Sequence, residues 1–230
     1  LLPSSAAPEL PALQVLKLAP GEAIQYPVDV LHNDSVVAWY LQGADNSWAD
    51  RAATAMTAQV MKSGFFDQLR TEQQLGYIVS TFAWPQLDVP GMVMLVQSPV
   101  ANAATVSDAM EAFMAGVEPA LDEAQFARHQ AALVSEILRP HKNLWERAEF
   151  YWQSIAKKQW DFDSRRQLAA AVEALTLDDW RAYYRQVFLQ QRHSLQVVAP
   201  GQWGVLPASE HRVVESAEAL KAGHDVYQID

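Results

Sequence analysis

The stretch FFDQLRTEQQLGYIV, residues 65–79, changes character within a few positions. Its first part is mostly polar and predicts a short helix over about 65–74. Gly76 is expected to end that helix, because glycine is common just past a helix C-terminus. The apolar run that begins at Tyr77 then has the composition of a β-strand. The stretch therefore predicts a junction at which a polar helix passes directly into a strand.

A second helix is expected just before this junction. Apolar residues recur every four positions from 48 to 60, a spacing that puts them on one helical face. Ser47 is a plausible N-cap and Gly64 a plausible stop, which predicts a helix over about 47–61. Three strands are predicted before it, at 14–18, 24–30 and 34–42. Pro27 would confine the second of these to a sheet edge, because proline lacks a backbone N–H.

The remainder of the chain is mostly helical. After the junction, strands are predicted at 77–83 and 92–97, and a final strand at 194–199. Apolar periodicity, prolines and Thr176, which resembles the start of a capping box, predict the helices between them. These helices span about 104–116, 122–138, 143–158, 163–175 and 177–188. Strands early and late with helices between favour an α+β fold: an antiparallel-rich sheet with helices packed on one face.

The expected domain organisation is simple. Residues 1–20, with three prolines in the first twelve positions, are predicted to be an N-terminal extension or linker. Residues 21–205 are predicted to form the α+β domain. The polar, weakly patterned residues 206–230 are predicted to be a C-terminal tail. The N-terminus resembles a cut inside a longer protein, since it has no initiator Met and no positive segment typical of a signal peptide.

Composition excludes several classes of protein. The chain has 230 residues and a formal charge of −10, and it contains no cysteine. A disulfide scaffold, a Cys-type zinc site and a thiol nucleophile are therefore ruled out. The acidic balance argues against a nucleic-acid partner, which requires a basic face. No apolar stretch is long enough to span a bilayer, so no membrane partner is expected.

The histidines form no recognisable metal motif. None of the six lies three or four residues from another, which excludes H-E-x-x-H and its inverted form H-x-x-E-H. No metal ligand is therefore assigned to this chain. A self-contained enzyme with a cryptic metal site is the least favoured reading, since the histidine spacing does not support one.

Arg70 and Tyr77 are the candidate functional residues of the junction. A guanidinium offers five hydrogen-bond donors in a fixed plane and a phenol offers one. Together they could hold a peptide carbonyl or stabilise an oxyanion. The alternative is that Arg70 pairs with Asp67 or Glu72 on the surface, while Tyr77 is an ordinary strand residue.

Residues 69–79, LRTEQQLGYIV, closely resemble a hallmark motif of the pitrilysin/insulin-degrading-enzyme (insulinase) family of inverzincin zinc metallopeptidases. In that family the motif lies in the last of four homologous domains, within the C-terminal half. Weaker likeness follows in the expected order at 93–98, 151–163 and 194–198, so the resemblance covers about residues 24–200. It implies the fold predicted above, and for bacterial members it favours a periplasmic location.

The resemblance also implies a division of labour. The family's zinc ligands and catalytic Glu lie on an H-x-x-E-H motif in the N-terminal domain, which this chain lacks. By the same resemblance, Arg70 and Tyr77 are catalytic and substrate-binding residues that reach the peptide near the scissile bond. Phe66, the aromatic residue before the motif, helps to form the pocket for the side chain after the cut.

The sequence therefore predicts the C-terminal, non-zinc domain of a zinc-dependent endopeptidase. Its expected partners are a peptide substrate and a zinc-bearing N-terminal half of the same or a partner polypeptide. No cofactor is expected in this chain, which alone is predicted to be inactive. The alternative is a non-catalytic peptide-binding or assembly subunit that keeps the fold without taking part in hydrolysis.

Overall fold

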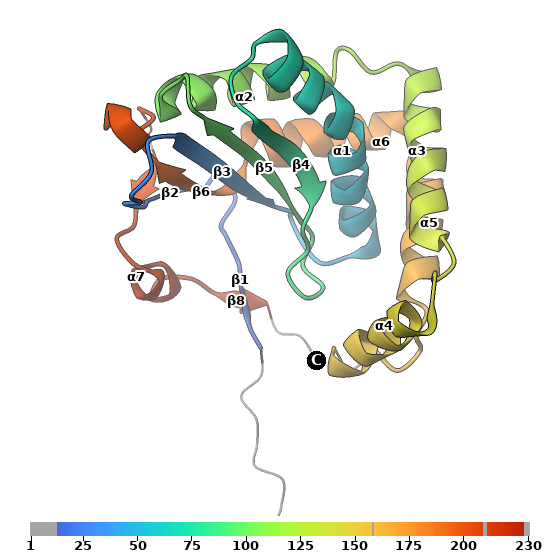
Figure 1. The fold of residues 1–230 in the computed structure, drawn as a ribbon. Helices are drawn as coiled ribbons and strands as arrows, with labels where there is room; N and C mark the ends of the chain where they lie inside the picture. Colours follow the sequence, from blue (N-terminus) through green and yellow to red (C-terminus); the bar gives the residue numbers. More distant parts are fainter. Residues whose placement is uncertain (1–12, 158, 209–210, 228–230) are drawn as a thin grey trace, which may run out of the picture.

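A computed structural model describes residues 13–157, 159–208 and 211–227 (Figure 1). Its main sheet has the strand order β4-β5-β3-β6-β2-β7. The pairs β4–β5, β5–β3 and β3–β6 are antiparallel, whereas β2 is parallel to both β6 and β7. The predicted antiparallel-rich α+β sheet is thus confirmed, with a parallel portion at one side. The strands are β2 (Ala23–Pro27), β3 (Ser35–Gln42), β4 (Ile78–Ala83), β5 (Gly91–Ser98), β6 (His193–Ala199) and β7 (Arg212–Val213).

Helices cover one face of this sheet, as predicted (Figure 1). Alternate residues of β3, such as Trp39, are buried against α1, α2 and α6 because successive strand residues point to opposite faces. Trp180 of α6 is fully buried in the same core. The helices are α1 (Trp48–Phe66), α2 (Ala103–Val117), α3 (Glu123–Leu138), α4 (Leu144–Ala156), α5 (Ser164–Ala174), α6 (Leu177–Tyr183) and α7 (Ala217–Lys221), with π-helical turns η1 (Asp67–Glu72) and η2 (Tyr184–Gln190).

The helix before the junction is longer than predicted. Ser47 caps it as expected, its side chain accepting a hydrogen bond from the Asp50 N–H. However, Gly64 does not end the helix, which continues without a break into η1. Buried apolar residues continue past Gly64 at the helical spacing, with Phe65 and Leu69 fully buried. Their packing outweighs the modest cost of an exposed glycine inside a helix.

Strand β2 is not an edge strand, so the expectation from Pro27 is wrong for the strand as a whole. β2 lies between β6 and β7, and β7 pairs only with Ile24 and Gln25. Pro27 sits beyond the end of β7, where it pairs with Val198 on one side alone. Its missing N–H therefore costs no hydrogen bond with β7, in agreement with the general rule for proline in sheets.

The two ends of the described chain meet each other. Strand β1 (Val15–Leu16) pairs with β8 (Val226–Tyr227) in a separate two-stranded sheet. The segment predicted as a tail thus supplies β7 to the main sheet, and also α7 and β8. Residues 1–12 of the predicted linker lie outside the described residues, and the domain boundaries stay a prediction.

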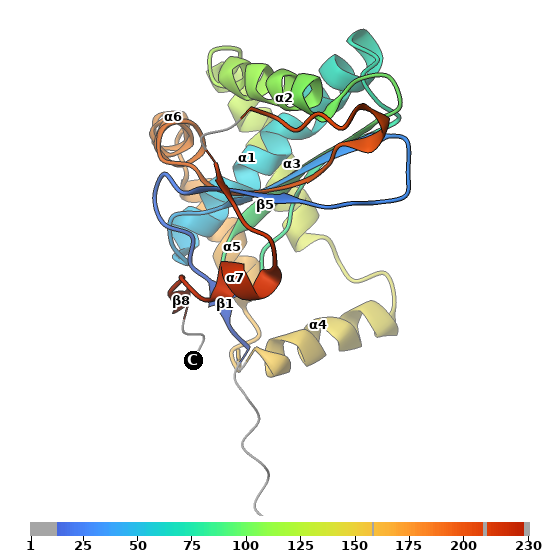
Figure 2. The same cartoon turned by 90° about the vertical axis from the view of Figure 1, so that its left-hand side faces the viewer.

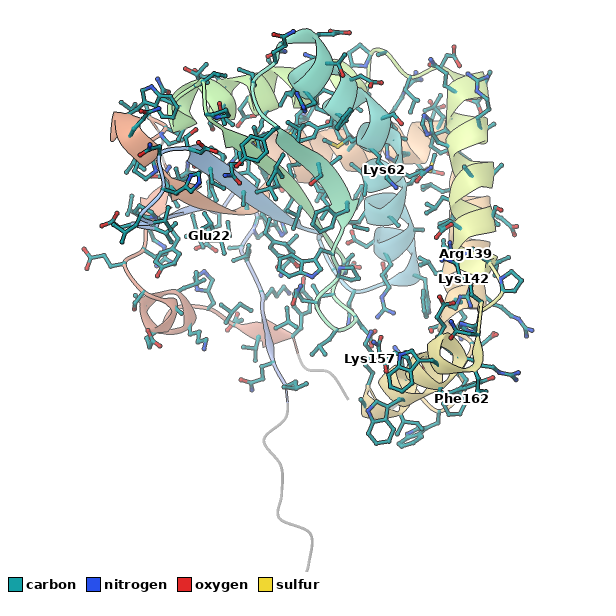
Figure 3. All side chains as sticks on the ribbon, viewed as in Figure 1. Glu22, Lys62, Arg139, Lys142, Lys157 and Phe162 are labelled. Carbon is teal, nitrogen blue, oxygen red and sulfur yellow. The ribbon has the colours of Figure 1, made fainter. Side chains whose placement is uncertain are left out.

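Helix α4 projects from the body of the molecule, as Figure 2 shows. It is tied to the β4–β5 turn through Lys157, whose Nζ donates to the Leu87 carbonyl at 3.2 Å and lies 3.7 Å from Asp88 (Figure 3). Its free side carries Trp145 and Trp152, which are 78% and 67% exposed. Within the described residues, no helix has both the length and the apolar character needed to cross a membrane.

Candidate functional site

The site begins where α1 widens into the π-helical turn η1. The Gln73 N–H donates to the Gln68 carbonyl at 2.9 Å and the Leu75 N–H to the Leu69 carbonyl at 3.0 Å, so the last hydrogen bonds span five and six residues. Leu69 is buried in the core while Arg70 is exposed. π-Helical turns are rare in proteins overall, and those that occur are often found at functional sites. The turn therefore places Arg70 on the surface, while Leu69 on its other side packs into the core.

The chain reverses at Gln74 rather than at Gly76. Gln74 has a φ of +52°, in the left-handed region that an L-residue seldom adopts, and Gly76 does not share this conformation. Gly76 is needed for another reason. A Cβ at this position would lie 3.1 Å from the Gln97 carbonyl carbon and closer still to its oxygen. Only glycine lets the chain pass so near to β5 on its way to Tyr77 and β4.

Phe66, Arg70 and Tyr77 line one surface pocket of about 580 Å³. The three residues come from α1, η1 and the position just before β4, and the junction brings them together. Phe66 is 43% exposed and Tyr77 is 49% exposed, so both rings are accessible. The remaining lining residues are Thr71, Gln74, Gly76 and Pro99. The pocket combines an apolar ring with a guanidinium and a phenol, which suits a peptide group and its side chain.

Arg70 does not form the surface ion pair with Asp67 or Glu72 that the alternative interpretation predicts. Across the part of the chain that the structure describes, Arg70 forms no salt bridge, neither with Asp67 nor with Glu72. The expectation of a local surface ion pair is therefore wrong. Asp67 and Glu72 belong to the lining of a different pocket, beside α2 and α3. Arg70 instead lines the pocket of Phe66 and Tyr77.

Tyr77 has two polar neighbours that sequence reasoning missed. Gln97 of β5 donates through Nε2 to the Tyr77 phenol oxygen, and the same nitrogen donates to Asp34 Oδ2 at 3.0 Å. The pKa of Tyr77 is raised above its ordinary value, first because the Asp34 carboxylate acts on the phenol as a hydrogen-bond acceptor, then through desolvation and the Asp34 charge. No spacing in the sequence signals this group, because β-sheet pairing alone brings the three residues together.

The residues present do not fit a zinc site. Among the residues that the structure describes, no three His, Asp or Glu side chains are grouped closely enough to hold a metal ion. Two of the histidines are engaged elsewhere: His224 lies 2.9 Å from Glu22 Oε1, and His141 lies 3.2 Å from Arg165.

A second pocket, of about 220 Å³, lies between α1, the β4–β5 turn and the start of α5, and no motif predicted it. Arg51 stacks on Trp48 there, with 4.5 Å from its guanidinium carbon to the ring centre. Asp88 lies 3.9 Å from Arg51 and accepts from Gln159 at 2.7 Å. Its charged groups are largely paired with each other, so this cluster serves to tie the α4–α5 segment to the sheet.

Comparisons with known proteins find peptidase relatives of this chain. A family model described as "PQQ synthase PqqF-like, C-terminal lobe domain 4" matches residues 56–152, the range that contains the junction and β5. Insulin-degrading enzyme of Mus musculus is 27% identical over 173 residues, which cover 73% of this chain and 17% of that protein. Protease 3 of Escherichia coli K12 is 25% identical over 161 residues, covering 69% and 17%. The chain thus spans about a sixth of the length of these relatives.

Solved structures show the same fold. The crystal structure of pitrilysin superposes with a TM-score of 0.87 at 22% identity, over 97% of this chain and 25% of pitrilysin. A peptidase M16 inactive domain from Pseudomonas fluorescens superposes with a TM-score of 0.58 at 15% identity, over 90% of this chain and 49% of that one. The family model, the protease relatives and the pitrilysin fold together support the resemblance of this chain to the C-terminal domains of insulinase-family (M16) peptidases.

Proposed function

We propose that this chain binds and orients a peptide substrate opposite a zinc site carried by a separate N-terminal half, in the same or a partner polypeptide. The chain alone is then inactive, because the groups that activate water belong to the other half. The observation that supports this is the shared pocket of Phe66, Arg70 and Tyr77. The relatives named above are proteases, and each is several times longer than the matched region.

The three side chains have distinct roles in this proposal. Arg70 holds a backbone carbonyl of the peptide through its planar donors. Tyr77 donates its phenolic proton to the carbonyl oxygen as that oxygen gains negative charge. Phe66 contributes apolar surface for the side chain that follows the cleaved bond. Because these groups stand on a different wall from the nucleophile, hydrolysis depends on the two halves closing over the peptide.

The test is Tyr77→Phe in the full-length peptidase, which removes one donor and keeps the ring. Loss of a single oxyanion donor costs about a hundredfold or more in kcat, so kcat should fall that far while KM changes little. Tyr151→Phe is the matched control, since Tyr151 is an exposed tyrosine on α4, away from the junction. An unchanged kcat in Tyr77→Phe would remove Tyr77 from the mechanism.

A non-catalytic peptide-binding or assembly subunit is the second candidate, favoured by the fold shared with an inactive M16 domain. The two candidates separate in a binding experiment with a fluorescent peptide. Both require saturable binding to the chain that weakens in Phe66→Ala. Only the peptidase domain increases hydrolysis when it is mixed with a zinc-bearing half. Saturable binding without such an increase would favour the binding subunit.

A further inference from the structure

One end of the sheet brings together three polar side chains that are far apart in the sequence. Asp34 immediately precedes β3, Gln97 lies near the end of β5, and Tyr77 immediately precedes β4 (Figure 1). In the sheet register, Gln97 stands opposite Val36 on one side and Ile78 on the other. It therefore lies between the two strands whose starts carry Asp34 and Tyr77.

We propose that Asp34 and Gln97 are positioning residues for Tyr77, holding its phenol at the pocket as a hydrogen-bond donor for the peptide. This inference rests on the proposed function and names the groups that prepare one of its residues. Gln97 Nε2 carries two hydrogens, and it donates one to Asp34 Oδ2 at 3.0 Å and one to the Tyr77 oxygen. A single amide nitrogen thus connects a buried carboxylate to an exposed phenol.

Asp34 determines which way the Gln97 amide faces. Asp34 is only 8% exposed, and its carboxylate can only accept, so the amide must turn its NH2 group toward it. The same nitrogen then faces the phenol, whose oxygen becomes the acceptor. The phenol's own proton then remains available to donate to a peptide carbonyl in the complex. With the amide reversed, its oxygen would accept that proton and compete with the peptide.

The surrounding charges act in the same direction. The Asp34 carboxylate raises the pKa of Tyr77, so the phenol keeps its proton further into alkaline solution. Two other charged or titratable groups face this end of the sheet. His32 Nδ1 accepts from the Asp34 N–H at 3.1 Å and lies 3.8 Å from Asp34 Oδ1, and Arg70 lines the same pocket as Tyr77.

The frame around the three residues is rigid. Ser35, next to Asp34, donates through Oγ to the Ala101 carbonyl at 2.7 Å. Ser98, next to Gln97, accepts from the Ala101 N–H at 2.8 Å. Both serines are fully buried. The start of β3 and the end of β5 are thus both hydrogen-bonded to the loop that leads into α2, which holds Asp34 and Gln97 in register.

The first experiment uses the 230-residue chain with ring-labelled tyrosine, in which NMR follows the titration of Tyr77. Its signal is assigned by its loss in Tyr77→Phe. Asp34→Asn removes the carboxylate, and Gln97→Met removes the connecting amide at similar size. Asp34→Asn should lower the Tyr77 pKa toward the ordinary value of about 10, whereas Gln97→Met, which removes a donor to the phenol oxygen, should raise it. Asp108→Asn, which removes the same charge from an exposed position on α2, should leave it unchanged. Unchanged Tyr77 titration in both test variants would overturn the inference.

The second experiment is a double-mutant cycle in the full-length peptidase. Gln97→Met should lower kcat about tenfold with KM little changed, as expected for one lost hydrogen bond. In the Tyr77→Phe background the same change should have no further effect, because the group that Gln97 positions is gone. A purely structural role for Gln97 would lower activity equally in both backgrounds, and this result would refute the proposal.

The two experiments separate the inference from the function on which it rests. If Tyr77→Phe keeps full activity, the proposed function fails, but the titration still shows whether Asp34 and Gln97 control the phenol. If Tyr77→Phe is impaired while neither titration nor cycle responds to Gln97→Met, the positioning role alone fails. Should Asp34→Asn not fold, Gln97→Met carries both measurements, with circular dichroism as the check on folding.

Discussion

Gly76→Ala adds a single methyl group at the tightest point of the junction, and we expect it to destabilise the domain. The new Cβ would lie 3.1 Å from the Gln97 carbonyl carbon and 3.4 Å from Val96 Cγ1, and closer still to the Gln97 oxygen. The nearest atoms belong to the backbone of β5, a strand paired on both sides, so they cannot move aside as a flexible side chain would. Either β5 shifts or the junction does.

The size of this effect follows from the cost of overpacking. Forcing an extra carbon into a well-packed region costs about 1–3 kcal/mol, and a backbone clash belongs at the upper end, about 2–3 kcal/mol. For a domain of this size that corresponds to a fall in Tm of about 4–12 °C. The entropic gain of alanine over glycine opposes it by only about 0.5–1 kcal/mol.

Thermal and urea unfolding, followed by circular dichroism, measure this change. Gly116→Ala is the matched control, because Gly116 lies inside α2 with no atom within 4 Å of the position of a new Cβ. Alanine there should stabilise the domain by about 0.5–1 kcal/mol, as in other helix interiors. If Gly76→Ala proves as stable as the wild type, the close approach to β5 is not what requires glycine, and our account of the junction is wrong.

Three further changes test other parts of the fold. Burial, and then the nearby Asp45, raises the pKa of Asp50 to about 6. Between about pH 4 and 6 the folded state therefore holds a proton that the unfolded state has lost, so the free energy of unfolding should fall by on the order of 2–3 kcal/mol as pH rises through that window. Urea unfolding measures this fall, which should be absent in Asp50→Asn. Thr57→Val removes the acceptor of the Trp180 indole N–H, bonded at 3.1 Å, and should cost about 1–3 kcal/mol in the same assay, whereas an unchanged stability would mean that the buried N–H finds another partner. Asp88→Ala breaks the ties to the α4–α5 segment, so hydrogen exchange should quicken in α4 and not in the sheet; uniform quickening would contradict a local role.

Local features of the fold could be predicted well. Ser47 and Thr176 cap α1 and α6 through side-chain oxygens that accept the N–H three residues on. These contacts involve neighbours in the chain, so the identity of a few residues is enough to anticipate them. Strands β3 and β5 could be predicted equally well, because β-branched and aromatic residues cluster there. The prediction that Gly64 ends the helix is wrong for the opposite reason. The burial of Phe65 and Leu69 in the core outweighs the weak tendency of glycine to end a helix.

The candidate site could be predicted only in part. Phe66, Arg70 and Tyr77 lie within twelve positions of one another, so a short sequence motif is enough to identify them together. In the structure they line one pocket. Asp34 and Gln97 stand 43 and 20 residues from Tyr77, and nothing in their surroundings marks them as its partners. Their meeting depends on the register of three strands. That register follows from long-range hydrogen bonding and shared burial, which one strand's sequence does not specify.

The α+β class and the helix-to-strand junction could be predicted from the sequence, as could the positions of Phe66, Arg70 and Tyr77 on that junction, because periodicity, caps and a short motif are local properties. The tertiary structure alone decided the strand order β4-β5-β3-β6-β2-β7, the reason for Gly76 and the connection from Asp34 through Gln97 to Tyr77. Each of these depends on the approach of segments that are distant along the chain. Such contacts form only when the whole core is assembled, since the free energy that holds them comes from burial shared among all of its elements.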